Sequence, residues 1–228
     1  MRREVTLSEI SDGRLYGLND MVKAGCDGCR DCFSCCCGMG TSIVLDPLDM
    51  HRLARGLGES PAGLLEKYLE LNVVDGIVQP NLPMAGASER CRFLNEEGRC
   101  SIHPFRPGIC RLFPLGRYYD GSGGFQYFLQ VHECRKEART KVKVRKWIDT
   151  PEPSRYDAYI GEWHGFLVSL QEKLAGENQA GEQLTGEQAN AVSLYILKTF
   201  YLTPYETEDF YGEFEKRLAQ GKAWRDGL

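Results

Sequence analysis

The apolar positions in the last third of the chain recur with the period of an α-helix. Apolar side chains follow helical spacing over residues 156–174, and Gly176 comes directly after them. This pattern predicts one long amphipathic helix that ends before the glycine. A polar stretch at 176–188 separates it from two further predicted helices, over 189–202 and 207–220.

Shorter elements are predicted nearer the N-terminus. Residues 41–45 have the composition of a short strand. The Asp-Pro pair at 46–47 is a helix start signal, and the apolar positions after it predict a helix that Gly56 and Gly58 stop. A Ser-Pro pair at 60–61 repeats this signal and predicts a second helix over 62–71.

The middle of the chain alternates as strands do. Residues 72–79 predict a single strand. Residues 91–94 and 100–103 flank a polar turn, and residues 117–119 and 125–131 flank a glycine-rich linker. Each of these two pairs predicts a hairpin.

These elements predict an α+β fold. Its centre would be a small, irregular, cysteine-rich core with short hairpins, and several α-helices would pack against that core. We expect residues 1–150 to form this cysteine-cluster domain. Residues 151–228, which contain no cysteine, would form a helical layer that packs on it.

Composition and charge narrow the class of protein. The 228 residues are 42% hydrophobic and 26% charged, and the formal net charge is −4. This balance suits a globular protein and gives no basis for nucleic-acid binding. No apolar segment follows the basic start Met1-Arg2-Arg3, and no apolar run reaches the length of about 18 residues that a membrane span needs. We therefore expect a cytoplasmic protein without nucleic-acid or membrane partners.

Ten cysteines are the strongest chemical signal, and six of them lie within residues 26–37. Because persistent disulfides are uncommon in the cytoplasm, this number of thiols indicates metal ligands. Bacterial ferredoxins bind an iron–sulfur cubane through the spacing C-x2-C-x2-C-x3-C, in which the fourth thiolate serves a different cluster. Here the same spacing is formed by Cys26, Cys29, Cys32 and Cys36.

The consecutive residues Cys35, Cys36 and Cys37 complicate this assignment. Neighbouring side chains of an extended chain point in opposite directions, so all three are not expected to bind one ion. At least one of them should face a second site or remain a free thiol.

A second group of cysteines follows at longer and unequal spacings, and consists of Cys91, Cys100, Cys110 and Cys134. An Arg-Pro pair opens a short helical turn that carries Cys110, and Arg106 and Arg111 bracket this cysteine. We expect both arginines to donate hydrogen bonds to metal-bound sulfur and to offset its negative charge. The predicted metal ligands are therefore Cys26, Cys29, Cys32, Cys35, Cys36, Cys91, Cys100, Cys110 and Cys134.

Four thiolates can hold either a zinc ion or an iron–sulfur cluster, and the spacing does not separate the two. The density of thiols favours iron, because three successive two-residue spacers suit a cubane better than a zinc knuckle. The chain has no nucleotide-binding, P-loop or zinc-protease motif that would point to another chemistry.

Taken together, these motifs resemble the CxxCxxCC cysteine-cluster family of zinc- or iron-chelating proteins, also called the YkgJ family. The resemblance covers about residues 26–135. It rests on the C-x2-C-x2-C-C run that begins at Cys29, the helix start at 46–54, the Cys-Arg-Phe-Leu segment at 91–94, and the Arg-Pro-Gly-Ile-Cys segment at 106–110. Flagellin lysine N-methylases carry a similar cysteine domain. Cys26 and Cys37 are additions to the family pattern.

The leading hypothesis is an iron–sulfur protein with one or two cysteine-ligated clusters, most simply of the 4Fe-4S type. It would carry electrons or perform redox chemistry with an unidentified redox partner protein. One alternative is a structural zinc module that binds a partner. Another, implied by the resemblance alone, is a methyltransferase-like enzyme related to the flagellin lysine N-methylases.

Overall fold

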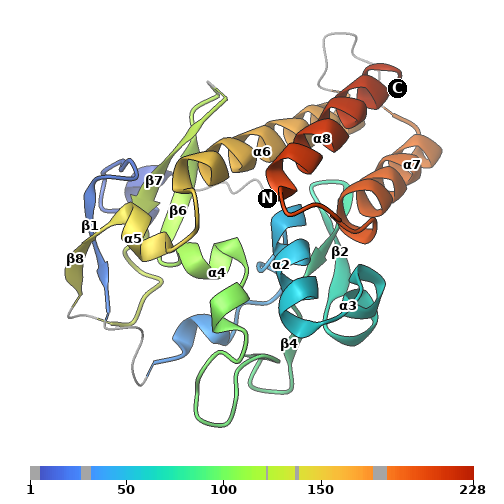
Figure 1. Ribbon diagram of the computed structural model, residues 1–228. Coiled ribbons are helices and arrows are strands. Elements are labelled where there is room, and N and C mark those ends of the chain that lie inside the picture. The colour runs from blue at the N-terminus through green and yellow to red at the C-terminus, as the bar shows by residue number, and fades with distance from the viewer. Residues whose placement is uncertain (1–5, 27–31, 122, 137–138, 177–183) are drawn as a thin grey trace.

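The computed structural model describes residues 6–26, 32–121, 123–136, 139–176 and 184–228. Short strands, short helices and loops form one part of the molecule, and the long C-terminal helices lie along its other side (Figure 1). The strands pair two by two in small antiparallel sheets, and helices pack around them. The predicted α+β class is confirmed.

The C-terminal helices begin with α6 (Pro153–Ala175), which ends at Gly176 in the left-handed conformation, as the sequence predicts. The next helix, α7 (Gly186–Ile196), starts slightly earlier than predicted and ends in a π-helical turn, η4 (Leu197–Leu202). The last helix is α8 (Phe210–Asp226).

Helix α2 (Pro47–Leu57) begins at the predicted start and ends directly before Gly58, whereas Gly56, also predicted to stop it, lies within its last turn. The side chain of Asp46 accepts a hydrogen bond from the backbone N–H of Asp49 at 2.8 Å, and Gly58 closes the helix with φ +68°. Helix α3 (Pro61–Lys67) begins at the predicted Ser-Pro signal.

The prediction that the second helix extends to residue 71 is wrong. Strand β2 (Glu70–Val74) begins there, and an Asp-Gly turn connects it to strand β3 (Ile77–Asn81) in a regular hairpin. Both turn residues have positive φ, which suits the tight turns of hairpins. The single strand predicted over 72–79 is therefore two strands, and their pairing overrides the local helical pattern.

The strand predicted over 41–45 is also incomplete. These residues are extended beside β3, but they form only one isolated bridge, between Val44 and Asn81. Two backbone hydrogen bonds, from Leu45 to Pro80 and from Leu82 to Ile43, complete the contact. The segment nevertheless adds to the face that β2 and β3 present to the interior.

Of the two predicted hairpins, the second is confirmed as β6 (Leu115–Tyr119) paired with β7 (Phe125–Leu129). The first is reduced to a tight turn with a single bridge between Leu94 and Cys100. A very short pair, β4 (Met84–Ala85) and β5 (Arg90–Cys91), precedes it. After it come the short helices η3 (His103–Phe105) and α4 (Gly108–Leu112).

The N-terminal segment has structure that the sequence pattern did not predict. It contains the one-turn helix α1 (Leu7–Ile10) and strand β1 (Met21–Gly25), followed by the short helix η2 (Ser34–Cys36). Strand β1 pairs with β8 (Thr140–Lys143), more than a hundred residues away, and α5 (Val144–Ile148) continues from β8.

Tyrosine side chains join the C-terminal helices to the cysteine-rich part. The hydroxyl of Tyr159 on α6 donates to the carboxylate of Asp46 at 3.1 Å and accepts from the N–H of Leu48 at 3.0 Å. The hydroxyl of Tyr201 on η4 donates to the carbonyl of Leu45 at 2.9 Å. Buried apolar residues of both parts form one cluster. Within the described residues, no helix is both long and apolar enough to span a membrane.

Candidate metal centre

Five cysteines line one cavity of about 130 Å³. Helix η2 contributes Cys35 and Cys36, β5 contributes Cys91, and α4 contributes Cys110, while Cys100 lies in the loop between β5 and η3. None of the five forms a disulfide. The fold thus brings thiols from four separate places along the sequence together.

Helix η2 explains how two consecutive cysteines reach the same cavity. The expectation of opposite directions assumed an extended chain, whereas Ser34–Cys36 is a 3₁₀ turn, in which neighbouring side chains are about 120° apart instead of opposite. Cys37 follows in extended conformation and pairs with Arg90 in a backbone bridge. It is not among the residues that line the cavity.

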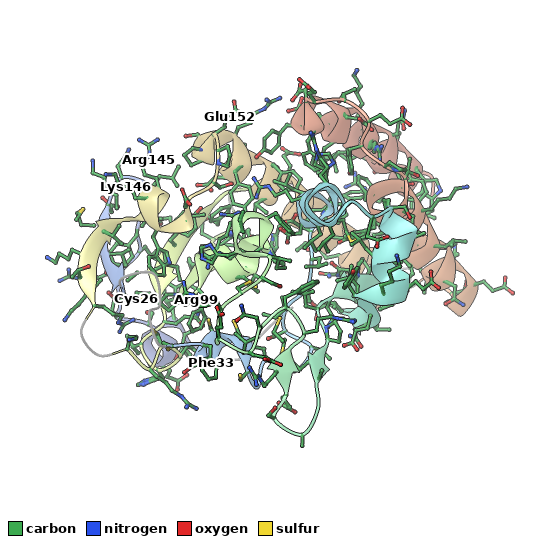
Figure 2. All side chains as sticks on the ribbon, turned by 60° about the horizontal axis from the view of Figure 1, so that its bottom comes forward. Cys26, Phe33, Arg99, Arg145, Lys146 and Glu152 are labelled. Carbon is green, nitrogen blue, oxygen red and sulfur yellow. The ribbon has the colours of Figure 1, made fainter. Side chains whose placement is uncertain are left out.

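Phe33 lies directly before η2, and its side chain is exposed (Figure 2). The guanidinium of Arg90 lies 5.9 Å from the centre of the Phe33 ring. A Cβ at Gly98 would lie 2.9 Å from the same ring, so the ring packs closely on the turn between Cys91 and Cys100. This contact joins the two cysteine-bearing loops.

Helix α4 places Cys110 against the buried start of α2. The N–H of Gly108 donates to Oδ1 of Asp49 at 2.7 Å. A Cβ at Gly108 would stand 2.2 Å from the hydroxyl of Tyr156, so only glycine allows this approach. Trp147 of α5 donates its indole N–H to the last carbonyls of the helix, at 3.1 and 3.2 Å.

Burial and mutual proximity keep most of the cavity thiols protonated in the absence of metal. Burial is the largest cause that raises the pKa values of Cys91, Cys100 and Cys110. A hydrogen bond from the Cys36 thiol, aided by the charge of Arg106, lowers the pKa of Cys35 to about 7. That pairing raises the pKa of Cys36. A metal that binds thiolates would therefore release protons here.

The two predicted arginines occupy different places. Arg106 lines the cavity, and its buried Nε has no hydrogen-bond partner within the described part of the chain. Arg111 does not line the cavity. Its guanidinium donates to the carbonyls of Arg106 at 3.2 Å, of Asp149 at 2.9 Å and of Pro104. Arg111 therefore holds the loop that carries Arg106.

The buried carboxylate of Asp49, next to Cys110, and the half-buried carboxylate of Asp46 beside it were not predicted as part of the site. Burial, with the nearby Asp46, raises the pKa of Asp49 to about 8, and Asp49 in turn helps to raise the pKa of Cys110. The sequence pattern predicts Asp46 only as a helix cap. The signal that could have found the pair is the Asp-Pro-Leu-Asp start, which places two carboxylates on one helical turn.

The remaining predicted ligands lie elsewhere. The sulfur of Cys32 is 3.7 Å from the hydroxyl of Ser34. Cys26 is buried directly after β1, and Cys134 is half-buried after β7. None of these three lines the cavity. Cys29 lies outside the described residues.

The cavity wall suits a group that binds through sulfur. Its donors include five thiols, which soft metals and iron–sulfur clusters prefer. The unpartnered Nε of Arg106 can donate to a sulfur atom in the cavity. In the described ranges, no three or more His, Cys, Asp or Glu side chains are already grouped to hold a single metal ion. The donors therefore surround a space instead of converging on one point.

Comparison with known proteins gives one match. The family model CxxCxxCC, described as a "putative zinc- or iron-chelating domain", matches residues 28–142. This range contains all five cavity cysteines and about half of the chain. No curated protein and no solved structure matches.

Proposed function

Because the chain belongs to the CxxCxxCC family, whose model describes a zinc- or iron-chelating domain, we propose that its cavity thiols hold an iron–sulfur cluster. The cluster would serve electron transfer or redox chemistry. The observation that carries this proposal is the meeting of five cysteines around one cavity. All five would be available to hold the group, and a 4Fe-4S cluster needs four thiolates.

The size of the cavity supports a cluster over a single zinc ion. A dry cavity of about 150 Å³ can accommodate benzene, and the cavity here has about 130 Å³. A structural zinc is held by four ligands that close tightly around it. Donors that surround an open space fit a larger group better.

The surroundings of the thiols also fit a buried, negatively charged group. Apolar side chains such as Met39, Leu82 and Met84 form much of the wall. Arg106 adds a positive charge and an unpartnered donor at the same wall. Hydrogen bonds to sulfur and limited solvent exposure are the features by which proteins set the potential of such clusters.

A bound cluster would supply one-electron transfer at this place. The chain's own residues would fix its position, exclude water and offset its charge. The electrons would be exchanged with a redox partner protein, because the described structure offers no nucleotide-binding loop for a soluble electron carrier.

The proposal is tested on full-length protein purified without oxygen. We expect a brown protein with broad visible absorbance, in which iron and acid-labile sulfide are present in equal amounts, about four of each per chain for one cubane. A colourless protein that holds one zinc per chain and no sulfide would overturn the iron–sulfur proposal and leave the zinc module in its place.

A further inference from the structure

Positive charge is concentrated in the segment that forms β8 and α5. Five of the eight residues 139–146 are lysine or arginine, and none of the eight is acidic. The chain as a whole has a net charge of −4, so the rest of the molecule is acidic. A local surplus of one sign creates a field that attracts partners of the opposite sign. The function proposed above gives this segment no role.

The pairing of β1 with β8 places part of this charge on one face. Met21 stands opposite Lys143, and Val22 stands opposite Val142. Side chains alternate along a strand, so the two valines point toward the interior and their neighbours point outward. Val22 is fully buried, and Val142 packs against the core. The exposed side chains of the outer face are those of Met21, Lys23, Lys141 and Lys143.

The charged surface continues onto α5. Lys143 directly precedes this helix, in which Val144 and Ile148 are buried. Arg145 and Lys146 are exposed and lie next to each other at the outer surface (Figure 2). We call the combined surface the basic face. It consists of Lys23, Lys141, Lys143, Arg145 and Lys146.

The five cations of the basic face have no acidic partner within the described chain. Each ion pair that the described residues form involves other side chains. Asp20 and Asp149 lie near α5, where their carbonyls accept hydrogen bonds from Val144 and Arg111, but neither carboxylate pairs with the face. Like charges on one face repel each other. An acidic partner would offset that repulsion.

Helix α5 connects the basic face to the metal centre. It lies beside α4, the helix that carries Cys110 (Figure 1). The indole N–H of Trp147 donates to the carbonyls of Leu112 and Phe113, and Phe113 lines the metal cavity. One short helix therefore lies between α5 and the cavity thiols. Because electron tunnelling weakens steeply with distance, a redox partner has to dock close to the metal in this way.

The chemistry of the basic face favours a protein over a nucleic acid or a membrane. Single-stranded nucleic acids stack their bases on exposed aromatic rings. The only aromatic residue of β1, β8 and α5 is Trp147, which is half-buried and bonded to α4. Membrane-surface helices insert several apolar side chains, whereas the only exposed apolar side chain of these three elements is that of Met21. Electron-transfer complexes of proteins, by contrast, are small, and charge complementarity steers their association.

We propose that the basic face is the docking surface for an acidic redox partner protein. The carboxylates of the partner lie against the lysines and arginines, and Met21, which is 48% exposed, provides an apolar contact. One electron passes between a flavin or iron–sulfur cofactor of the partner and the metal centre, so that one is oxidised as the other is reduced. The electron step rests on the iron–sulfur function proposed above, while docking depends only on the charges of the face.

The test uses an acidic flavodoxin as the probe, with full-length protein purified without oxygen. NMR titration of isotope-labelled, oxidised flavodoxin measures the dissociation constants of the wild type, of Lys141→Glu/Lys143→Glu and of Lys198→Glu/Lys216→Glu. The last variant makes the same changes at exposed lysines of η4 and α8 that also form no ion pair within the described chain. Circular dichroism checks the fold of each protein, and iron and sulfide are counted in each.

We expect the wild type and Lys198→Glu/Lys216→Glu to bind flavodoxin equally. Lys141→Glu/Lys143→Glu should bind it at least about tenfold more weakly at low salt. An increase in NaCl from about 20 mM to about 300 mM should weaken wild-type binding at least about tenfold, because salt screens exposed charges. Reduced flavodoxin should transfer electrons to the wild-type cluster, with a similar loss of rate in Lys141→Glu/Lys143→Glu.

Absent or salt-independent binding to the wild type, or equal binding to the three folded proteins, would overturn the docking surface and leave the cluster proposal standing. Binding that depends on Lys141 and Lys143 in a protein without iron and sulfide would instead overturn the electron step. A short DNA duplex and phosphatidylserine vesicles are titrated in parallel. If either bound the wild type more tightly than flavodoxin and lost binding in Lys141→Glu/Lys143→Glu, the face would belong to that partner and the proposal would be wrong.

Discussion

Buried and half-buried polar side chains of this chain lie around two of its cavities. Arg106 and Asp49 lie next to the cavity thiols, and Gln79 and His164 line a neighbouring cavity. Among these groups, the buried Nε of Arg106 loses hydration on folding and has no replacement hydrogen bond within the described chain. At the scale of single residues, the protein thus loses folding free energy at the wall of the metal cavity, where a bound group can supply the missing hydrogen bond.

His164 gives a pH-dependent prediction at this scale. Its pKa in the folded state, about 4, is below its ordinary value of 6.5, so the unfolded chain binds the proton more readily between these values. Stability is therefore complete above about pH 6.5 and falls as the pH decreases toward 4. His164→Phe keeps an aromatic ring on Tyr119 and removes the titration.

We expect the wild type to lose roughly 1 kcal/mol more unfolding free energy than His164→Phe between pH 7 and pH 5, a value reduced for the partial exposure of the ring. Urea titrations of both proteins at the two pH values measure this difference. Parallel losses in the two proteins would show that His164 does not carry the effect.

At the scale of elements, prediction succeeded where the chain marks its own boundaries. Helix α2 has a capping aspartate and a closing glycine, and α6 has a sustained helical pattern and Gly176. The β2–β3 hairpin was missed although its Asp-Gly turn is a known hairpin signal, because leucines at 69 and 71 continued a helical pattern. The pairing of β1 with β8 has no local signal, since its partners are far apart in sequence.

The contact between α2 and η3 gives a prediction for a pair of glycines. A Cβ at Gly56 would lie 2.5 Å from the ring of Phe105, whereas a Cβ at Gly165, on the exposed side of α6, would meet nothing within 4 Å. Gly165→Ala should stabilise the protein by about 1 kcal/mol, because alanine favours a helix. Gly56→Ala should destabilise it by about 1 kcal/mol, because the overpacking outweighs the same gain.

Urea unfolding of the two alanine variants and the wild type provides the measurement. Gly165 lies in the middle of α6 and Gly56 in the last turn of α2. Because the change in helix propensity is small and favourable at both sites, opposite signs of the two effects would identify the contact with Phe105. Equal stabilisation of both would mean that the ring moves aside without cost.

At the scale of the whole molecule, the sequence identified the thiols but not their meeting place. Cys35, Cys36, Cys91, Cys100 and Cys110 come together because several turns and short helices fold onto one another. No spacing rule encodes that arrangement. Cys32 has ferredoxin-like spacing, yet it lies outside the cavity lining.

Removal of the metal should therefore affect one part of the molecule more than the rest. The cavity is made mostly by residues 35–43 and 82–115, with Gln130 and Glu133, while α6 and α8 pack through buried aromatic side chains such as Trp163 and Phe214. We expect chelation to increase amide hydrogen exchange at least tenfold in the two cavity segments, with little change in α6. Hydrogen exchange with mass spectrometry measures this pattern, and a uniform change along the chain would contradict it.

The central claim is that the cavity thiols hold the metal, and the metal content of two matched variants tests it most directly. Cys110→Ser removes a cavity thiol, and Cys37→Ser makes the same change at a thiol outside the cavity lining. After purification without oxygen, iron and zinc per chain are measured in both variants and in the wild type, with circular dichroism as a check on folding. We predict that Cys110→Ser loses most of its metal while Cys37→Ser keeps the wild-type amount. Equal metal content in two folded variants would contradict the account.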